Sequence, residues 1–252
     1  MSGSRSGGRW PVTVVVPTRN EAGNVAELVS RLPPVERVLF VDDSDDDTPA
    51  VIRAVAGEAD LRVELLHRPR GRRPDGLSGA VTAGIATVDC TWTCVMDGDL
   101  QHPPEDVARL FERSSAGDVD LVIASRRNWG SINEGLGPVR RAVSGVFGRL
   151  AGVLFGRDLH GVSDPLSGFF LVRTDALDLD RLHATGFKIL LEILVTHPDL
   201  RRDEVGFAFQ RRGSGASNGS VTEAARYLRH VVDLRRRSAR GRTVRPARSG
   251  SG

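Results

Sequence analysis

An apolar run that stops at two carboxylates is the feature that most constrains how this chain folds. Residues 92–96 are mostly apolar, and Asp97, Gly98 and Asp99 follow them directly. Two prolines come next, at 103 and 104. Since proline is tolerated in the first turn of a helix, this order predicts a buried strand, a polar turn and then a helix that begins near Pro104.

The polar turn is a candidate metal site. Asp97 and Asp99 lie one residue apart, and the side-chain amide of Gln101 follows closely. Oxygen ligands of this kind suit a hard divalent cation such as Mg²⁺ or Mn²⁺. Mg²⁺ usually takes one or two protein carboxylates and completes its shell with water and substrate phosphate. The turn therefore predicts a metal that acts together with a nucleoside diphosphate, and an ordinary surface turn is the alternative.

Apolar runs alternate with helical segments along the first half of the chain. The runs are rich in β-branched residues and show no strict alternation of polar and apolar residues, which is typical of buried parallel strands. They occupy residues 12–16, 38–41, 63–66, 92–96 and 121–124. The order strand, helix, strand predicts an α/β fold, with a mostly parallel sheet covered by helices on both faces.

Polar side chains follow four of these predicted strands directly. They are Glu21 after the first strand, Asp42 and Asp43 after the second, Asp97 and Asp99 after the fourth, and Ser125 and Arg126 after the fifth. The turns that enter the strands carry fewer acids and bases, whereas solvated loops would be polar at both ends. Ligands of parallel sheets bind beyond the carboxyl ends of the strands. The asymmetry therefore predicts an active site along one edge of the sheet.

Composition restricts the class of protein. A chain of 252 residues with 40% hydrophobic and 27% charged residues is an ordinary globular chain of one large or two small domains. Cys90 and Cys94 are too few for a disulfide framework, so we expect free thiols and a cytoplasmic protein. Signal-peptide features and an uncharged apolar run long enough to span a bilayer are both missing from the sequence.

The basic residues point away from nucleic acid. Lys188 is the only lysine, the other bases are arginines, and the net charge is +3. Aromatic residues that would stack on bases are not interleaved with these arginines. A dinucleotide-binding fold is also disfavoured, because no Gly-x-Gly-x-x-Gly follows the first predicted strand.

The ends of the chain differ from its body. We expect residues 1–9 to be disordered, residues 10–216 to form the catalytic domain and residues 217–235 to form an amphipathic helix. Residues 236–252 are rich in arginine, serine and glycine, so we expect disorder there as well. This tail is either simply solvated or docks on an anionic membrane, which would make the protein peripheral on the inner face of the cell membrane.

A series of motifs resembles one known family. In chain order they are Pro17-Thr-Arg-Asn-Glu21, Val41-Asp42-Asp43-Ser44, Met96 to Pro104, Ser125-Arg126, Asp164-x-x-Ser167-Gly168-Phe169, Gly186 to Leu194, and Phe209-x-x-Arg212-x-x-Gly215. Together they resemble the family 2 glycosyltransferases, and within that family the polyprenyl-phosphate (dolichol-type) mannose synthases. The resemblance covers residues 12–234 and implies a GT-A (Rossmann-like) nucleotide-sugar transferase fold.

The resemblance implies a reaction. The expected enzyme is an inverting glycosyltransferase that moves mannose from GDP-mannose onto a polyprenyl monophosphate. A phosphate oxygen is already ionised at neutral pH, so the attack needs no strong general base. Transfer from a UDP-linked sugar to a soluble or secondary-metabolite acceptor is the alternative enzyme, and a binding module that has lost catalysis is the alternative class.

The resemblance also implies roles for single residues on the donor side. The positions that match the family's nucleotide-binding residues are Pro17, Glu21, Asp42, Asp43 and Asp97. A carboxylate that accepts hydrogen bonds from base or ribose donors is consistent with this role.

Metal and phosphate positions follow from the same motifs. Asp97, Asp99 and Gln101 match the metal and diphosphate site, and Arg126, Arg140, Arg141 and Arg212 match phosphate-facing arginines. Guanidinium groups suit phosphate because they bind it in a bidentate way. The catalytic step is expected to depend on Asp99, Arg126 and Arg141. We expect His102 to line the turn rather than to bind the metal.

Three positions depart from the family's usual pattern. Arg19 stands where tyrosine is usual, Phe170 where arginine is usual, and Asn218 where a lysine is usual. The change at 218 removes one cation that would face phosphate. It leaves open whether this chain holds the donor diphosphate in another way or uses a different substrate.

Overall fold

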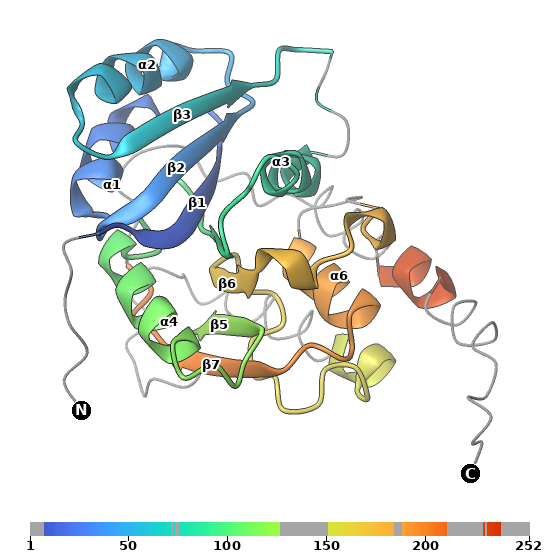
Figure 1. The fold of residues 1–252 in the computed structure, drawn as a ribbon. Helices are drawn as coiled ribbons and strands as arrows, with labels where there is room; N and C mark the ends of the chain where they lie inside the picture. The colour runs from blue at the N-terminus through green and yellow to red at the C-terminus, as the bar shows by residue number, and fades with distance from the viewer. Residues whose placement is uncertain are drawn as a thin grey trace, which may run out of the picture.

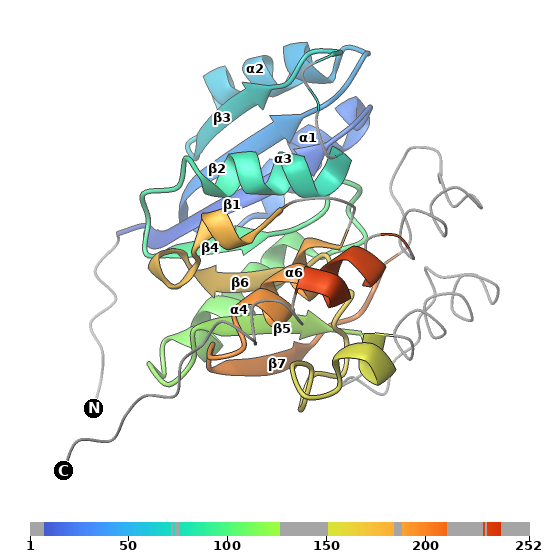
Figure 2. The ribbon, with the colours of Figure 1, turned by 90° about the vertical axis from the view of Figure 1, so that its right-hand side faces the viewer.

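The computed structural model describes residues 8–71, 73, 76–126, 151–183, 188–210, 229 and 231–237. Within them, a seven-stranded sheet has the order β3-β2-β1-β4-β6-β5-β7, which Figure 2 shows from the side. The strands are β1 (Trp10–Thr18), β2 (Val35–Asp42), β3 (Arg62–His67), β4 (Trp92–Val95), β5 (Leu121–Ser125), β6 (Phe170–Arg173) and β7 (Arg202–Gly206). All neighbours pair in parallel except β6, which is antiparallel to both β4 and β5. The predicted, mostly parallel sheet is confirmed.

Helices cover both faces of this sheet (Figure 1). The α-helices are α1 (Val25–Arg31), α2 (Thr48–Glu58), α3 (Gly76–Ile85), α4 (Val107–Ser114) and α6 (Ile189–Thr196). Short 3₁₀ helices lie at Ala22–Asn24, Pro104–Asp106, Thr174–Ala176 and Leu179–Arg181, and further helical turns at 151–155 and 231–237. None of the helices within the described ranges has the length and apolar character needed to cross a membrane.

The sheet separates two apolar clusters, one on each face. Residues of α1, α2 and α4 pack in one cluster, and residues of α3 and α6 pack in the other. In β1, Val14 and Val16 belong to the first cluster, while Val15 belongs to the second. Both sides of each central strand are therefore buried, which explains why these strands are continuous apolar runs in the sequence.

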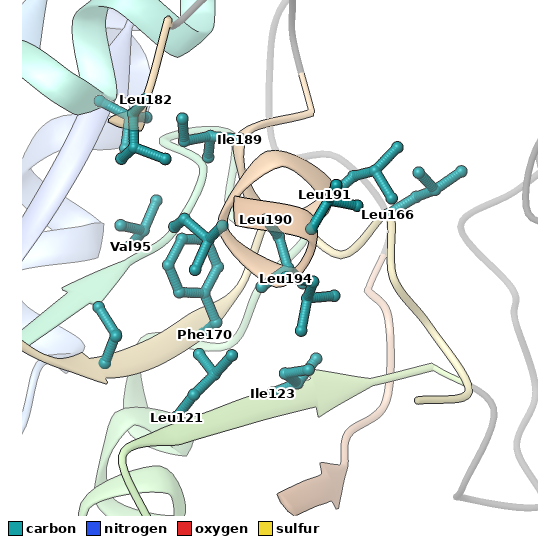
Figure 3. Packing of buried hydrophobic residues seen from close by; sticks show 14 of the residues in the cluster. Val95, Leu121, Ile123, Leu166, Phe170, Leu182, Ile189, Leu190, Leu191 and Leu194 are labelled. Carbon is teal, nitrogen blue, oxygen red and sulfur yellow. The ribbon is translucent and has the colours of Figure 1, made fainter. Parts of the chain in front are cut away.

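Helix α6 contributes the centre of the second cluster (Figure 3). Its side chains Leu190 and Leu194 lie over Phe170 of β6 and Leu121 of β5. Phe170 is fully buried there. An arginine at this position would bring a charge into an apolar cluster, so the departure from the family pattern at 170 serves packing in this chain.

Glu192 is the exception on α6, because a carboxylate lies fully buried among leucines. Its Oε1 accepts a hydrogen bond from the backbone N–H of His183 at 2.7 Å. The guanidinium of Arg237, on the helical turn at 231–237, lies 4.0 Å from the same oxygen. These two groups partly offset the cost of burying the charge and tie the helical turn at 231–237 to α6.

Element boundaries differ from the expected ones where the chain is charged. The sequence from Glu204 to Phe209 predicts one further strand late in the chain. In the structure β7 spans Arg202–Gly206, so it begins and ends earlier than this pattern indicates. Its charged residues are held by partners, since Arg113 binds Asp203 at 2.5 Å and Arg202 bonds to the carbonyl of Asp158. A charged edge strand gives no apolar signal, which explains the shift. The sequence also predicts helices at 137–156 and 217–235. Residues 151–155 and 231–235 are helical, and most of the remaining residues of both segments lie outside the described ranges.

The packing of α3 on β1 and β2 generates a stability prediction. A Cβ at Gly84 would lie 2.6 Å from Cγ1 of Val15 and 2.8 Å from Cγ2 of Val41. We expect Gly84→Ala to lower the free energy of unfolding by about 1–3 kcal/mol, because the core must shift to admit the methyl group. Urea unfolding followed by circular dichroism measures this change.

Gly57→Ala is the matched control for that substitution. Gly57 lies in α2, and a Cβ there would meet no atom within 4 Å. Alanine is the better helix former, so this variant should be more stable by about 0.5–1 kcal/mol. Equal unfolding midpoints for the two variants would contradict the close contact at Gly84.

Candidate active site

The predicted site residues lie at the carboxyl ends of neighbouring strands. In the β1–β2 pair Thr18 is opposite Asp42, and in the β1–β4 pair Val15 is opposite Val95. The polar segments that follow these strands therefore begin at the same edge of the sheet. Gly98 marks how close they come, because a Cβ there would lie 2.9 Å from Cγ2 of Thr18 and 3.6 Å from the carbonyl oxygen of Pro17. A side chain at position 98 would therefore force Thr18 or the turn to shift.

Asp42 holds the strand ends together. Its Oδ1 accepts hydrogen bonds from Thr18 Oγ1 at 3.1 Å and Ser44 Oγ at 2.5 Å. Its Oδ2 accepts from the backbone N–H of Ser44 at 3.2 Å and lies 2.9 Å from Nδ1 of His67. The residue has no exposed surface. Asp42 thus links β1, β2 and β3, and in this arrangement its carboxylate faces protein donors.

Asp43 is fixed by an arginine. Arg68 donates to its two carboxylate oxygens, from Nε at 2.8 Å and from Nη2 at 2.6 Å. Both residues are 8% exposed. This bidentate pair sets the orientation of the Asp43 carboxylate at the rim of the sheet.

Pro17 lies near the end of β1, and Glu21 lies on the turn that follows. The backbone N–H of Glu21 donates to Thr48 Oγ1 at 3.1 Å, and its Oε2 accepts from Asn24 Nδ2 at 2.5 Å. Asn20 adopts a left-handed conformation with φ of 59°, which asparagine tolerates better than most residues. Its Oδ1 accepts the backbone N–H of Asp45, so the turns after β1 and β2 are bonded to each other. Pro17, Glu21, Asp42 and Asp43 therefore form one group.

The candidate metal turn follows β4. Asp99 is 5% exposed and Gln101 is 7% exposed, whereas the side chain of Asp97 is 41% exposed. Asp99 Oδ1 accepts the backbone N–H of Gln101 at 3.1 Å, and Gln101 Nε2 donates to the carbonyl of Gln210 at 3.4 Å. The structure therefore places the three predicted ligands on one short turn.

His102 lines this turn, as expected. The backbone N–H of Asp97 donates to its Nδ1 at 3.1 Å. Burial lowers the pKa of His102 to about 4, and the nearby cations of Arg126 and Lys188 act in the same direction. The ring is therefore neutral at neutral pH, with Nδ1 as its acceptor nitrogen.

Arg126, at the end of β5, is paired with Asp164. Nε and Nη2 of Arg126 donate to Oδ2 and Oδ1 of Asp164 at 2.7 Å and 2.8 Å. Burial acts to raise the pKa of Asp164, but the bonds from Arg126 outweigh burial and hold this pKa below the usual range of an aspartate. The charge of Asp97 acts on the guanidinium of Arg126 as well. The predicted phosphate arginine thus belongs to the same site as the metal turn.

Sequence reasoning missed several residues of this site. Asp164, which orients Arg126, was seen only as part of a turn motif. Lys188 and Glu192 are spaced one helical turn apart in the sequence, which fits either an ion pair or a role near the donor site. In the structure, Nζ of Lys188 donates to the carbonyl of Leu166 at 3.2 Å, and its charge acts on Asp164 and His102. Lys188 could have been singled out in the sequence, because it is the single lysine of an arginine-rich chain. Arg140, Arg141, Arg212 and Asn218 lie outside the described residues.

The residues on the turn fit a metal that is completed by its substrate. Within the part of the chain that the structure describes, no group of three or more His, Cys, Asp and Glu residues gathers to form a full protein cage. Asp97 and Asp99 supply two carboxylates from one turn, which is the number that Mg²⁺ usually takes from protein before water and phosphate fill its shell. Gly168 keeps room at this point, because a Cβ there would lie 2.9 Å from Asp97 Oδ2.

Comparison with solved structures defines the class of fold. Glucosyl-3-phosphoglycerate synthase from Mycobacterium tuberculosis, in complex with Mn²⁺, UDP-glucose and phosphoglyceric acid, superposes with a TM-score of 0.67 at 19% sequence identity. The match covers 95% of this chain and 82% of that one. The fold is therefore that of a GT-A glycosyltransferase, as expected.

Sequence comparison identifies the family. Residues 13–178 match the family described as Glycosyl transferase family 2. A dolichol-phosphate mannosyltransferase from Saccharomyces cerevisiae is 33% identical, over 88% of this chain and 86% of its own length. One from Pyrococcus furiosus is 33% identical, over 88% of this chain and 63% of its own length. An undecaprenyl-phosphate mannosyltransferase from Micrococcus luteus is 31% identical, over 84% of this chain and 90% of its own length. The chain belongs to glycosyl transferase family 2 and is a glycosyltransferase.

The Arg126–Asp164 pair generates a prediction about stability and pH. Arg126→Leu leaves the Asp164 carboxylate, which is 4% exposed, without its bidentate partner. We expect a loss of about 3–5 kcal/mol in the free energy of unfolding at pH 7.5, the cost typical of breaking a buried pair from one side. Urea unfolding at several pH values measures it.

The sign of the pH dependence follows from the two pKa values of Asp164. In the wild type the folded-state pKa is lowered, so the stability from the pair is present above the unfolded pKa and is lost as the pH falls through the folded one. In the variant the guanidinium is gone, and only the charge of Lys188 and the backbone N–H of residue 126 still oppose burial. The pKa of Asp164 is therefore higher than in the wild type, so Asp164 takes up a proton more readily when folded. The difference between variant and wild type should shrink from pH 7.5 to pH 5.5. Arg201→Leu, which breaks an equally bidentate but exposed pair with Asp120, should change stability little at either pH.

Proposed function

We propose that this enzyme transfers mannose from GDP-mannose to a polyprenyl monophosphate, with inversion at the anomeric carbon. The observation that carries the proposal is the identity of 30–33% to dolichol-phosphate mannosyltransferases over most of this chain. The geometry of the site supports it, because nucleotide-side carboxylates and phosphate-side cations adjoin at one edge of the sheet.

In this proposal one group of residues binds the nucleoside of the donor, and a second group binds the metal. Pro17, Glu21 and Asp43 lie at or just beyond the carboxyl ends of β1 and β2, where the nucleoside would bind, and Asp42 holds these strand ends in place. Asp97, Asp99 and Gln101 lie on the neighbouring turn after β4, where they would hold Mg²⁺ or Mn²⁺. When bound, the cation neutralises charge on the diphosphate leaving group. The donor would thus lie across the junction marked by Gly98.

Arg126 would meet the phosphate of the acceptor. Nε and Nη2 of its guanidinium donate to Asp164. This bidentate pair holds the guanidinium in one orientation, so the direction of its third nitrogen, Nη1, is fixed as well. Lys188 adds a second cation beside Asp164. These charges attract an ionised phosphate and position its oxygen for attack. Since that oxygen is already ionised, the site requires no general base. Arg140, Arg141 and Arg212 would complete the phosphate contacts, as the family motifs imply.

A lipid acceptor requires the enzyme to work at a membrane surface. The arginine-rich segment 236–252 supplies cations that an anionic leaflet attracts at about 1 kcal/mol for each residue near the surface. We therefore propose peripheral contact with the cytoplasmic face of the membrane. Sedimentation with anionic liposomes at low and high salt checks this contact.

The metal turn generates a prediction about catalysis. We expect Asp99→Asn to lower the rate of sugar transfer by at least about 100-fold, because it removes a charged metal ligand. The amide oxygen of asparagine can still accept the backbone N–H of Gln101, so the melting temperature should stay close to that of the wild type. Release of GDP from GDP-mannose measures the rate.

Asp89→Asn is the control for that substitution, because Asp89 is an exposed acid before β4, at the opposite end of that strand from the turn. It should keep the wild-type rate. Near-normal turnover by Asp99→Asn would remove the metal role from this turn.

The choice of substrates generates a second prediction. With Mn²⁺ present, GDP should raise the melting temperature more than UDP, because a ligand at 100 times its dissociation constant stabilises by about 2.7 kcal/mol. The enzyme should release GDP in the presence of a polyprenyl phosphate and not with soluble acceptors. Stabilisation by UDP alone, together with turnover on a soluble acceptor, would replace the proposal with the UDP-sugar alternative.

A further inference from the structure

The turn that carries Asp97 and Asp99 includes strained backbone. Leu100 lies between Asp99 and Gln101 and has φ of 62°, a left-handed conformation that costs free energy for a residue with a branched side chain. Such a conformation persists only where the surroundings fix it. One bond inside the turn, from the N–H of Gln101 to Asp99 Oδ1, contributes to this. The turn needs further support to present its two carboxylates in one geometry.

His102 supplies that support from the end of the turn. Its Nδ1 accepts the backbone N–H of Asp97 at 3.1 Å, so the bond joins the last residue of the turn to the first. A neutral imidazole has one acceptor and one donor nitrogen, and an acceptor at Nδ1 puts the proton on Nε2. The bond therefore closes the turn into a ring that contains both carboxylate residues.

Three phenylalanines hold the imidazole ring in place. Phe169 stacks on it at a centroid distance of 5.2 Å and an interplanar angle of 25°. Phe207 and Phe209 meet its edge at 5.5 Å and 5.8 Å. Phe169 directly precedes β6, whereas Phe207 and Phe209 follow β7. The position of the turn is therefore tied, through one side chain, to two other strands of the sheet.

The same aromatic group contacts the phosphate side of the site. The guanidinium of Arg126 lies 5.7 Å from the centroid of Phe209. Gly168 fits so closely that a Cβ there would lie 3.3 Å from Cε1 of His102 and 2.9 Å from Asp97 Oδ2. His102, Asp97 and Arg126 are thus packed as one unit.

We infer that His102 is a positioning residue, whose Nδ1 fixes the backbone of Asp97 so that the turn presents both carboxylates to a divalent cation. This inference rests on the proposed function, because it takes the turn to bind a metal with a nucleoside diphosphate. The competing account is that the ring only fills space among the phenylalanines, in which case the acceptor nitrogen has no consequence for metal binding.

A pair of variants separates the two accounts. His102→Asn and His102→Leu both remove the ring and have side chains of the same branching, but only asparagine carries an acceptor oxygen near the position of Nδ1. We expect Mn²⁺ affinity in the presence of GDP to stay within about threefold of wild type for His102→Asn and to fall about tenfold for His102→Leu, the size expected for one buried hydrogen bond. Electron paramagnetic resonance of free Mn²⁺ measures both affinities without any turnover.

Two further variants control for packing. His102→Phe keeps an aromatic ring without an acceptor, and it should fold well and bind Mn²⁺ as weakly as His102→Leu. If His102→Leu does not fold, the comparison of His102→Phe with His102→Asn decides the matter. Val35→Ala shortens a fully buried side chain at the start of β2, at the opposite end of that strand from the edge where the turns lie, and should lose stability but keep the wild-type Mn²⁺ affinity.

The outcomes also separate this inference from the proposed function. Equal Mn²⁺ affinities for the asparagine, leucine and phenylalanine variants would overturn the positioning role while leaving the proposed function intact. If the wild-type protein binds no Mn²⁺ with either GDP or UDP, the metal site of the proposed function fails, and the inference fails with it. That second failure is visible before any substitution is made.

Discussion

The site depends on the parallel pairing of β1 with β2 on one side and with β4 on the other. Because the three strands run in the same direction, the turns after Thr18, Asp42 and Val95 all begin at one edge of the sheet. Residues more than fifty positions apart in the chain thereby adjoin. Gly98 shows how little space separates them, since any side chain there would press against Thr18. The chemistry proposed for this protein needs that proximity, because a nucleoside diphosphate must contact the turns after β2 and β4 at the same time.

The buried carboxylates of the site have a different task from the exposed one. Asp42 and Asp164 are 0% and 4% exposed, and protein groups hydrogen-bond to both oxygens of each carboxylate. Burying a charge is costly unless several donors satisfy it. Such residues make the framework rigid, whereas the side chain of Asp97 is 41% exposed and reaches solvent. Because the buried carboxylates are neutralised or hydrogen-bonded by protein groups, several acidic residues can lie at one short edge of the sheet without strong mutual repulsion.

The parallel core and the acidic strand ends were predictable, because buried strands and the residues that follow them leave a local pattern in the sequence. Long-range partners leave none. Asp164 lies 38 positions from Arg126, and nothing in the sequence near either residue indicates their pairing. The phenylalanines that contact His102 lie next to the ends of β6 and β7, and only the folded sheet reveals where these two strands lie. The start of β7 was predicted too late in the chain, because the charged, ion-paired residues with which this strand begins resemble those of a loop. Local patterns thus indicated where the site lies, and tertiary contacts decided how its side chains are held.

The reversed direction of β6 has a consequence for how this kind of enzyme can diversify. An antiparallel strand brings its first residues, rather than its last, to the functional edge, so Gly168 and Phe169 reach the metal turn from the segment that precedes β6. Everything between β5 and β6 therefore connects to the site at both ends, at Arg126 and at Asp164. Insertions or exchanges in that stretch can reshape the proposed acceptor side of the site while the proposed nucleotide side, built from β1 and β2, is left unchanged. Evolution could in this way vary what receives the sugar independently of what delivers it.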